Sequence, residues 1–383
     1  MSRKSKLYNT RSIGFRFNLQ CFVRDSNNIA SSNKTFYCRC FFAIAIIVIY
    51  LQYQYILDTV WTKNMPKDLI RTQVNRYYTY QYQRVMSYER FKAMKLALKN
   101  VDRSEMPRYQ KNTPICFLNK STLLGRIRVE TSYISPRKVE RLRLGVMSGG
   151  FYAPSHCRAK HKVAILVPFR NRTTNLSKFL RHMHPFLQKQ LLQYRIFVIE
   201  QIGREKFNKG ALYNIAFLET QRFGTWNCLV FQDVDLLPQD GRILYSCLRK
   251  PAHMCPALDC WQYQFSAIKS FGGVTSMTPE MYLQVNGYSN AYWNWGAEDD
   301  DMFVRIKASK LGVWRYNMTI ARFHCLPHPK NEYNPKRYIL LGNAKRRYKT
   351  DGLKSLQYKL IAIIKRKLFT HILVDVNPFN YTV

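Results

Sequence analysis

The run Val163-Ala164-Ile165-Leu166-Val167 decides the fold class of this chain, because its continuous apolar character predicts a buried strand. A helical pattern over 176–192, an apolar run over 195–200, a helical pattern over 209–218 and a further apolar run over 228–232 follow it. Parallel strands are buried on both faces and are joined through helices. The alternation therefore predicts an α/β fold with a Rossmann-like, doubly wound sheet whose ligands bind at the carboxyl ends of the strands.

Chemically suitable side chains follow the first and third of these strands. Arg170 and Arg172 lie just after the first strand, and Asp233 and Asp235 lie just after the third. The planar fork of arginine suits phosphate, and alternate carboxylates of an extended segment share a face on which both can approach one divalent cation. The plainer alternatives are a solvated arginine pair and an ordinary turn. The occurrence of both pairs at strand ends favours a site for a metal-bound diphosphate.

Four consecutive acids, Glu298-Asp299-Asp300-Asp301, stand out in a chain with 23 acidic and 61 basic residues. They follow Trp293-Asn294-Trp295-Gly296-Ala297, so carboxylates lie beside flat apolar rings of the kind that sugars bind. An alternative is a helix start, since acids in a first turn complement the dipole of a helix over 301–307. That alternative explains one or two acids and is compatible with a catalytic role for the others.

A further metal-binding candidate is the segment His324-Cys325-Leu326-Pro327-His328. Imidazole or thiolate beside carboxylate suits Mn²⁺ or another first-row ion better than Mg²⁺. The polar segment 331–337 that follows has the composition of a mobile loop.

The charge of the chain does not indicate a nucleic-acid-binding protein. The formal net charge is +38 and the pI is near 10.0, but lysines and arginines are scattered and no reader motif occurs. A basic surface equally attracts nucleotide-sugar phosphates, acidic glycans or an anionic membrane.

The first hundred residues predict membrane attachment. Residues 41–60 approach the ~20 apolar residues that a helix needs to cross a bilayer. A cleaved signal peptide is the alternative, but the preceding segment is too long and no small-x-small cleavage site follows. We expect a cytosolic tail over 1–40, a signal anchor over 41–60, a stem over 61–113 and a luminal catalytic domain over 114–383. The downstream cysteines lack zinc-site spacing and indicate disulfides, which agrees with a luminal location.

From about Cys116 to the C-terminus the chain resembles the β-1,4-galactosyltransferases of the Golgi, through motifs in the same order and at the same spacing. The matching stretches are FYAPSHC at 151–157, VAILVPFRNR at 163–172, FNKGALYNIAF at 207–217, FQDVDLLP at 231–238, FGGVTSMT at 271–278, NGYSNAYWNWGAEDDDMF at 286–303, KNEYNPKR at 330–337 and DGLKSLQY at 351–358.

The resemblance implies a nucleotide-diphosphate-sugar transferase fold of the A type with a D-x-D motif, preceded by a single transmembrane helix in the Golgi membrane. It implies Mn²⁺ held by Asp235 and His328. The family usually has Met three residues before that histidine, where this chain has Cys325, so the third ligand is either Cys325 or His324. The implied nucleotide-binding residues are Pro168, Phe169, Arg170, Arg172, Phe207, Lys209, Asp233 and Val234.

The same resemblance assigns the sugar-binding and catalytic residues. Asp299 matches the presumed base, with Glu298 and Asp300 beside it in the acidic cluster. The implied sugar-contacting residues are Ser270, Trp295, Gly296, Arg337, Tyr338 and Leu341. The implied disulfides are Cys116–Cys157 and Cys228–Cys247, and Cys255 and Cys260 are additional cysteines that can pair with each other.

The implied activity is an inverting, metal-dependent transfer of galactose from UDP-galactose to the 4-hydroxyl of a terminal GlcNAc on a glycoprotein or glycolipid. Ser270 raises an alternative, because galactose-specific members typically have a tyrosine there, and small residues are associated with UDP-GalNAc. Alternatively Tyr263, Phe265 or a backbone shift fills the space. A catalytically silent glycan- or polyanion-binding protein on the same fold is a further alternative.

Overall fold

The structure is a computed structural model, and it describes residues 109–377 apart from 120, 122, 124, 143, 265–268, 330 and 331. The predicted tail, the anchor over 41–60 and nearly all of the stem lie outside the described residues, so these assignments remain predictions. Within the described part of the chain, no helix is both long and apolar enough to cross a membrane.

The predicted strand–helix alternation forms the centre of the molecule. Strands β2 (Lys162–Phe169), β3 (Gln193–Gln201) and β4 (Cys228–Gln232) are parallel, with β2 between the other two. Helix α6 (Thr173–Gln188) connects β2 to β3, and α7 (Lys209–Thr220) lies between β3 and β4. The doubly wound α/β half predicted from the sequence is therefore confirmed.

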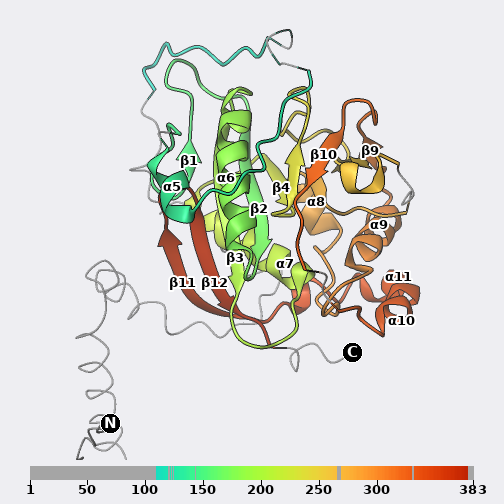
Figure 1. Ribbon diagram of the computed structural model, residues 1–383. Helices are drawn as coiled ribbons and strands as arrows, with labels where there is room; N and C mark the ends of the chain where they lie inside the picture. The colour runs from blue at the N-terminus through green and yellow to red at the C-terminus, as the bar shows by residue number, and fades with distance from the viewer. Residues whose placement is uncertain are drawn as a thin grey trace, which may run out of the picture. The chain divides into compact units, whose positions relative to one another are not determined.

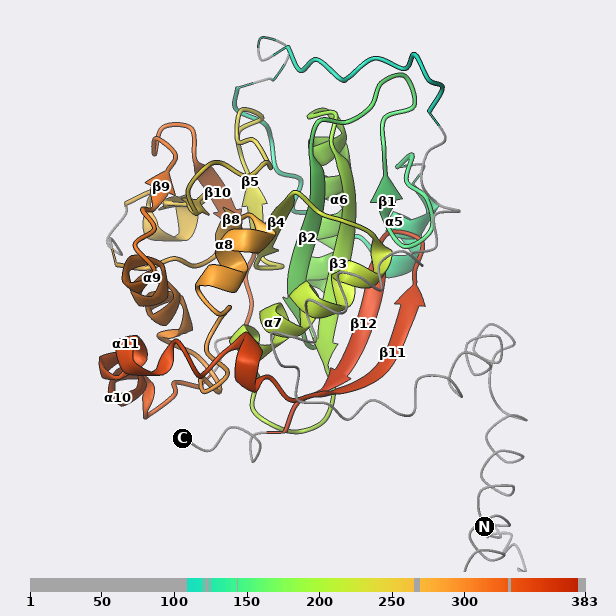
Figure 2. The same ribbon diagram turned by 180° about the vertical axis from the view of Figure 1, so that it is seen from behind.

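The two helices cover opposite faces of the sheet. Figure 1 shows α6 in front of β2, and Figure 2, from behind, shows α7 in front of the same strands. Alternate residues of β2 divide accordingly: Val163, Ile165 and Val167 pack in the core with α6, whereas Ala164 and Leu166 pack in the core with α7. Burial on both faces explains why β2 reads as a continuous apolar run.

Helix α6 is shorter than its sequence pattern predicts. It ends at Gln188, whereas the helical periodicity continues to residue 192. Leu191 has a left-handed backbone (φ 51°), and its N–H bonds to the carbonyl of Gln188 in a turn. The apolar residues after Gln188 therefore belong to the turn that leads into β3.

Further strands extend the sheet on both sides and make it mixed. Beyond β3 lie β12, which is parallel to it, and β11, which is antiparallel to β12; beyond β4 lie β8, β6 and β9, and β1 also pairs with β3. The bounds of these strands are β1 Phe151–Tyr152, β6 Ala252–His253, β8 Val274–Met277, β9 Trp314–Arg315, β11 Lys359–Lys365 and β12 Thr370–Asp375.

A second, three-stranded sheet and several short helices complete the described fold. The small sheet has the order β5-β10-β7. Its strand β5 begins directly after Asp233-Val234-Asp235, the segment that follows β4. The bounds are β5 Leu236–Pro238, β7 Ala257–Leu258, β10 Arg322–Cys325, α5 Pro136–Arg141, α8 Pro279–Gln284, α9 Glu298–Ala308, α10 Arg337–Gly342, α11 Ala344–Arg347, η4 Gln221–Phe223, η5 Asp259–Trp261 and η6 Leu353–Ser355.

The disulfides confirm two pairings and correct a third. Cys116–Cys157 and Cys228–Cys247 are bonded as the resemblance implies. The expected pairing of Cys255 with Cys260 is wrong, because Cys260 is bonded to Cys325 and Cys255 is a buried free thiol. Cys255 lies beneath Gly272 and Val274, to whose backbone its sulfur hydrogen-bonds, whereas Cys260 lies on the solvent side of η5.

Candidate active site

The four consecutive acids all lie in the first turn of α9. The chain enters this helix through Gly296 (φ 119°) and Ala297 (φ 72°), two left-handed residues that reverse the backbone. The helix-start interpretation is therefore correct for their position. It does not describe their roles, because Glu298 and Asp299 pair with Lys209, whereas Asp301 pairs with Arg305 and Arg347.

Lys209, the first residue of α7, lies at the centre of the acidic cluster. Its Nζ is 2.9 Å from Glu298 Oε1, 3.0 Å from Asp299 Oδ2 and 3.8 Å from Asp233 Oδ2. Burial alone would lower the pKa of Lys209, but the attraction of these three carboxylates raises it well above its ordinary value. Lys209 is therefore a buried, charged ammonium. It holds the acids at the start of α9 close to Asp233, which follows β4.

Asp299 has the environment of a general base. Burial raises the pKa of Asp299 to about 8; Lys209 opposes this rise, while Glu298 and Asp233 add to it. Gly272 packs directly against the Asp299 carboxylate, so a side chain at position 272 would collide with it. Asp299 Oδ1 is buried and has no hydrogen-bond partner among the described residues. An orphaned acceptor on a carboxyl group with a pKa near neutrality can take a proton from a bound hydroxyl.

The other two acids of the run separate into different environments. Asp300 is half-buried and bonds to the Ser270 side chain; burial raises its pKa and the Ser270 bond lowers it. Asp301 is fully buried, pairs with Arg305 and Arg347, and accepts a bond of 3.0 Å from the Tyr292 hydroxyl. Asp301 therefore belongs to the packing of the helices, whereas Glu298, Asp299 and Asp300 face the candidate site.

The carboxylate of Asp235 lies between the guanidinium of Arg172 and the imidazole of His328. Its Oδ2 is 2.9 Å from Arg172 Nη1 and 2.9 Å from His328 Nε2. Burial would raise the pKa of Asp235, but the hydrogen bond from His328 and the charge of Arg172 lower it, and the same bond raises the pKa of His328. A carboxylate oxygen and an imidazole nitrogen at hydrogen-bond distance form a donor pair that suits a first-row divalent cation. The residues present therefore fit the implied Mn²⁺.

His324 and Cys325 do not belong to this donor pair. His324 Nδ1 contacts Asp259 Oδ2, on the other side of β10, and Cys325 is bonded to Cys260. A disulfide sulfur has no thiolate to offer a metal. The prediction of Cys325 as a metal ligand is therefore wrong in this structure, and His324 does not replace it.

The remaining nucleotide-binding candidates lie at the predicted strand ends. Pro168 and Phe169 are the buried last residues of β2, and Arg170 stacks over the Phe207 ring at 5.2 Å. Val234 is buried between the two aspartates. These residues come together at the carboxyl edge of the sheet, where a doubly wound fold binds its ligand.

The two aspartates after β4 do not share one face as predicted from extended backbone. The Leu236 N–H bonds to the Asp233 carbonyl at 3.3 Å, which makes Asp233-Val234-Asp235 a tight turn. Asp233 accepts a bond of 3.2 Å from the Tyr213 hydroxyl and faces Lys209, whereas Asp235 faces His328. The turn thus directs the Asp233 carboxylate toward Lys209 and the Asp235 carboxylate toward His328.

Three of the predicted sugar-contacting residues, Trp295, Arg337 and Tyr338, lie with Tyr333 in an aromatic and guanidinium group whose rings are exposed. The Trp295 ring meets the Tyr333 ring edge-on at 5.0 Å, and their segments are joined by two backbone hydrogen bonds of 3.0 and 2.9 Å. Arg337 Cζ lies 4.5 Å from the Tyr338 ring centre. Gly296 permits this approach, because a Cβ there would lie 2.7 Å from Arg337 Cδ. Leu341 is on the next turn of α10.

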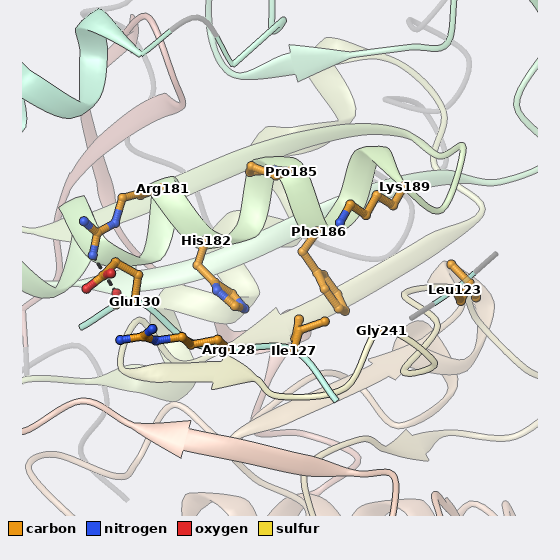
Figure 3. Close-up of a pocket in the computed structure, with 10 residues that line it drawn as sticks. All are labelled: Leu123, Ile127, Arg128, Glu130, Arg181, His182, Pro185, Phe186, Lys189 and Gly241. Atoms are coloured by element: carbon orange, nitrogen blue, oxygen red, sulfur yellow. Dashed lines mark hydrogen bonds between the residues drawn. The ribbon is translucent and has the colours of Figure 1, made fainter. Parts of the chain in front are cut away.

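A pocket on the α6 side of the fold lies apart from these residues. Figure 3 shows its lining, which contains none of the predicted site residues: Leu123, Ile127, Arg128, Glu130, Arg181, His182, Pro185, Phe186, Lys189 and Gly241. Arg181 is held there by the carbonyls of Glu130 and Ser132. The convergence of acids, Lys209 and Arg172 at the strand ends, and not this pocket, identifies the site.

Sequence reasoning missed three residues that shape the site. Tyr213 bonds Asp233, Gly272 packs on Asp299, and Asp259 binds the end of β10. The paired glycines at 272–273 precede β8, and that position was a signal of close backbone approach. Tyr213 reads as an ordinary core residue of α7, and nothing in the local pattern marks Asp259.

Two family models match the part of the chain that contains this site. The family model described as the N-terminal region of glycosyl transferase group 7 matches residues 116–248, and the model described as the N-terminal domain of galactosyltransferase matches residues 252–329. Residue 235 falls in the first of these regions, and residues 298–300 and 328 fall in the second.

Curated relatives include β-1,4-galactosyltransferase 2 of Cricetulus griseus, 39% identical over 66% of this chain and 70% of that one. β-1,4-galactosyltransferase 4 of the same species is 41% identical over 60% and 67% of the two chains. A solved catalytic domain of Drosophila β-1,4-galactosyltransferase 7 in complex with xylobiose is 30% identical, with a TM-score of 0.47 over 56% of this chain and 93% of that one. The identity and coverage of the curated relatives establish that this chain belongs to the β-1,4-galactosyltransferase family.

Proposed function

We propose that the chain transfers galactose, or N-acetylgalactosamine, from a UDP-sugar to the 4-hydroxyl of a terminal GlcNAc on a glycan, with inversion at the anomeric carbon. The observation that carries the proposal is Lys209, which joins the base candidate Asp299 to Asp233, two residues from the metal-ligand candidate Asp235. One site therefore contains a base for the acceptor hydroxyl and a ligand for the cation that would bind the leaving diphosphate.

The donor end is supported by positive and aromatic groups. Arg170 and Arg172 provide guanidinium forks for phosphate oxygens at the end of β2, and Phe207 provides a flat face held by Arg170. Asp235 and His328 would hold a divalent cation, which would neutralise charge on the departing diphosphate. Arg172 now pairs with Asp235, and it becomes available to phosphate when that carboxylate takes another partner.

The acceptor end supports a single displacement. As the acceptor O4 forms its bond to the anomeric carbon, the bond from that carbon to the diphosphate oxygen breaks. The O4 proton moves to the carboxylate of Asp299, whose side chain is 24% exposed and whose Oδ1 has no partner among the described residues. The exposed ring of Trp295 and the side chains of Arg337 and Tyr338 lie where an acceptor sugar can bind against them.

The test is the release of UDP from UDP-galactose by the purified full chain, with and without free GlcNAc and Mn²⁺. We expect release that needs both additions and that yields an equal amount of a β-1,4-linked disaccharide. Binding of GlcNAc without any UDP release would instead support a silent glycan-binding protein.

Ser270 favours a second donor, UDP-GalNAc. Its side chain bonds to Asp300, and its carbonyl accepts a bond of 3.2 Å from Arg315, so the residue lies beside the acidic cluster. A serine leaves space that a tyrosine at the same position would fill, and the acetamido group of GalNAc requires such space. The side-chain contacts of Tyr263 are to Gln239, through its hydroxyl at 3.0 Å, and to Arg322, over its ring, and not to Ser270; Phe265 lies outside the described residues.

We further propose that the catalytic domain lies in the lumen of the Golgi, behind a single membrane anchor over 41–60. The apolar character of this segment supports the anchor, and three disulfides in the described domain suit an oxidising lumen. Protease treatment of intact vesicles tests the topology: the domain should be protected until detergent is added, whereas degradation in intact vesicles would place it on the cytosolic side.

A further inference from the structure

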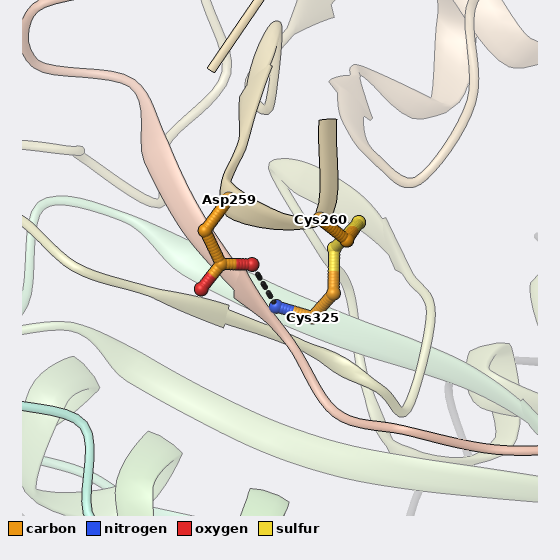
Figure 4. A group of neighbouring side chains, drawn as sticks. All are labelled: Asp259, Cys260 and Cys325. Atoms are coloured by element: carbon orange, nitrogen blue, oxygen red, sulfur yellow. Dashed lines mark hydrogen bonds between the residues drawn. A yellow bond between two sulfur atoms is a disulfide. The ribbon is translucent and has the colours of Figure 1, made fainter. Parts of the chain in front are cut away.

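The Cys260–Cys325 disulfide joins two segments beside the metal-ligand candidates. Cys260 is in η5, and Cys325 is the last residue of β10, 65 positions later in the sequence. His328 follows Cys325 by three residues. Figure 4 shows the disulfide with the neighbouring Asp259, whose carboxylate accepts a hydrogen bond of 2.8 Å from the Cys325 N–H.

The segment that ends at Cys325 is fixed from both sides. Asp259 contacts His324 Nδ1 as well as the Cys325 N–H, so η5 holds two successive residues of β10. On the other side, Cys325 pairs with Leu236 of β5, and the Leu326 N–H donates to the Asp235 carbonyl at 2.7 Å. The disulfide is the covalent part of this clamp.

His328 itself is held much more weakly. Its side chain is 32% exposed, with Nε2 2.9 Å from Asp235 Oδ2 and Nδ1 2.7 Å from the Pro329 carbonyl oxygen. Neither contact fixes the backbone of residue 328. The position of its imidazole relative to Asp235 therefore depends on where β10 ends, and the disulfide is the covalent one among the contacts that fix that end.

We propose that the Cys260–Cys325 disulfide positions His328 for the divalent cation, and that Cys325 supports the metal site through this bond and not as a ligand. The inference rests on the metal site of the proposed function. Residues that orient a metal ligand typically change metal affinity by ~10–100-fold when they are lost. The two cysteines are thus positioning residues for His328.

The first test measures Mn²⁺ affinity without turnover, from the electron paramagnetic resonance signal of free Mn²⁺, in the full chain and in Cys260→Ser, Cys325→Ser and double variants. We expect all three variants to lose a similar ~10–100-fold in affinity. The matched control, Cys116→Ser with Cys157→Ser, removes another disulfide and should keep wild-type affinity. Unchanged affinity in the double variant would overturn the inference, and so would a loss in Cys325→Ser alone, which would identify a thiolate ligand.

A second test needs no variant, so it remains decisive if the serine variants do not fold. Two glutathione molecules reduce a disulfide to two thiols and become glutathione disulfide. If the bond strengthens Mn²⁺ binding, Mn²⁺ must stabilise the bond by the same factor, because coupling is reciprocal. Thiol alkylation and mass spectrometry should show Cys260 and Cys325 less reduced with Mn²⁺ than without it, and Cys116–Cys157 unaffected. Equal reduction would contradict the inference, whereas a wild-type chain that binds no Mn²⁺ would contradict the proposed function itself.

Discussion

At Asp299, burial and the neighbouring Lys209 act on one carboxyl group in opposite directions. Burial raises the pKa of Asp299 to about 8, and Lys209 limits that rise. A base must be ionised to accept a proton. Activity should therefore increase as the pH rises toward 8, and it should decrease as the pH is lowered from 8. This behaviour follows from the folded environment, because an aspartate in water ionises near pH 4.

Replacement of Asp299 by Asn should reduce turnover by the ~10²–10⁴-fold that is typical for loss of a positioned base, while UDP-sugar binding persists. Steady-state kinetics and a donor-binding titration on the same variant check both parts. The matched control is Asp300→Asn, whose carboxylate bonds Ser270 and not Lys209. A greater loss of turnover in the control would assign the base to Asp300.

Replacement of Lys209 by Met should move the acidic limb of the pH–rate profile upward. The ammonium lowers the pKa of Asp299, so its removal leaves the carboxyl protonated to a higher pH and reduces activity at pH 7. Lys209→Arg retains the charge and should keep the limb near its wild-type position. A limb that stays in place in Lys209→Met would show that the limb does not report Asp299.

Replacement of Ser270 by Tyr should shift the donor preference toward UDP-galactose. A tyrosine fills the space available to an acetamido group, and steric changes of this kind command ~1–3 kcal/mol, or about 10–200-fold in kcat/KM. The measurement is kcat/KM for both donors in both proteins. Rejection of UDP-GalNAc by the wild type, with no change in the variant, would show that another group fills the pocket.

At the scale of elements, a buried charge network fixes α9 relative to α11 and the start of η6. Asp301 and Asp351 alternate with Arg305 and Arg347, and the side chains of Asp301 and Arg305 are fully buried. The network lies one helical position after the catalytic acids. It therefore holds the first turn of α9, and with it Asp299, in place.

Replacement of Asp301 by Asn should destabilise the fold by ~3–5 kcal/mol, because it leaves buried Arg305 and Arg347 short of a negative partner. Urea unfolding monitored by tryptophan fluorescence measures the free energy of unfolding. The control is Lys307→Gln, which removes an exposed charge from the same helix and should cost below ~1 kcal/mol. Equal effects of the two substitutions would contradict the role of the network.

The elements that sequence could predict are those with local signals. The three central strands and α7 agree closely with their apolar patterns. A strand that is buried on both faces needs apolar residues at successive positions, so its sequence is a continuous apolar run. The ends of elements and the partners of cysteines depend on contacts distant in sequence. The turn at Leu191 shortened α6, and the pairing of Cys260 with Cys325 brings together residues 65 positions apart. Spacing alone does not specify such a contact.

At the scale of the whole molecule, the predicted strand-end, acidic and metal-ligand residues come from segments far apart in the sequence yet converge at one edge of the sheet. The ends of β2 and β4, the first turns of α7 and α9 and the segment after β10 each contribute one part. The net charge of +38, carried by scattered lysines and arginines, suits anionic donors and glycans. Sequence predicted that residues at the ends of β2 and β4 and in the acidic run belong to one site, but it did not predict Tyr213, Gly272 or the division of the four acids between the site and the packing of the helices.

The measurement that tests the central claim most directly is the structure of the product. The detergent-solubilised full chain is incubated with UDP-galactose or UDP-GalNAc, a GlcNAc glycoside and Mn²⁺, and the product is analysed by nuclear magnetic resonance. We predict a β-1,4 linkage formed with an equal amount of UDP, lost on chelation of the metal and in Asp299→Asn. A product with the α configuration, or no product from either donor, would contradict the account.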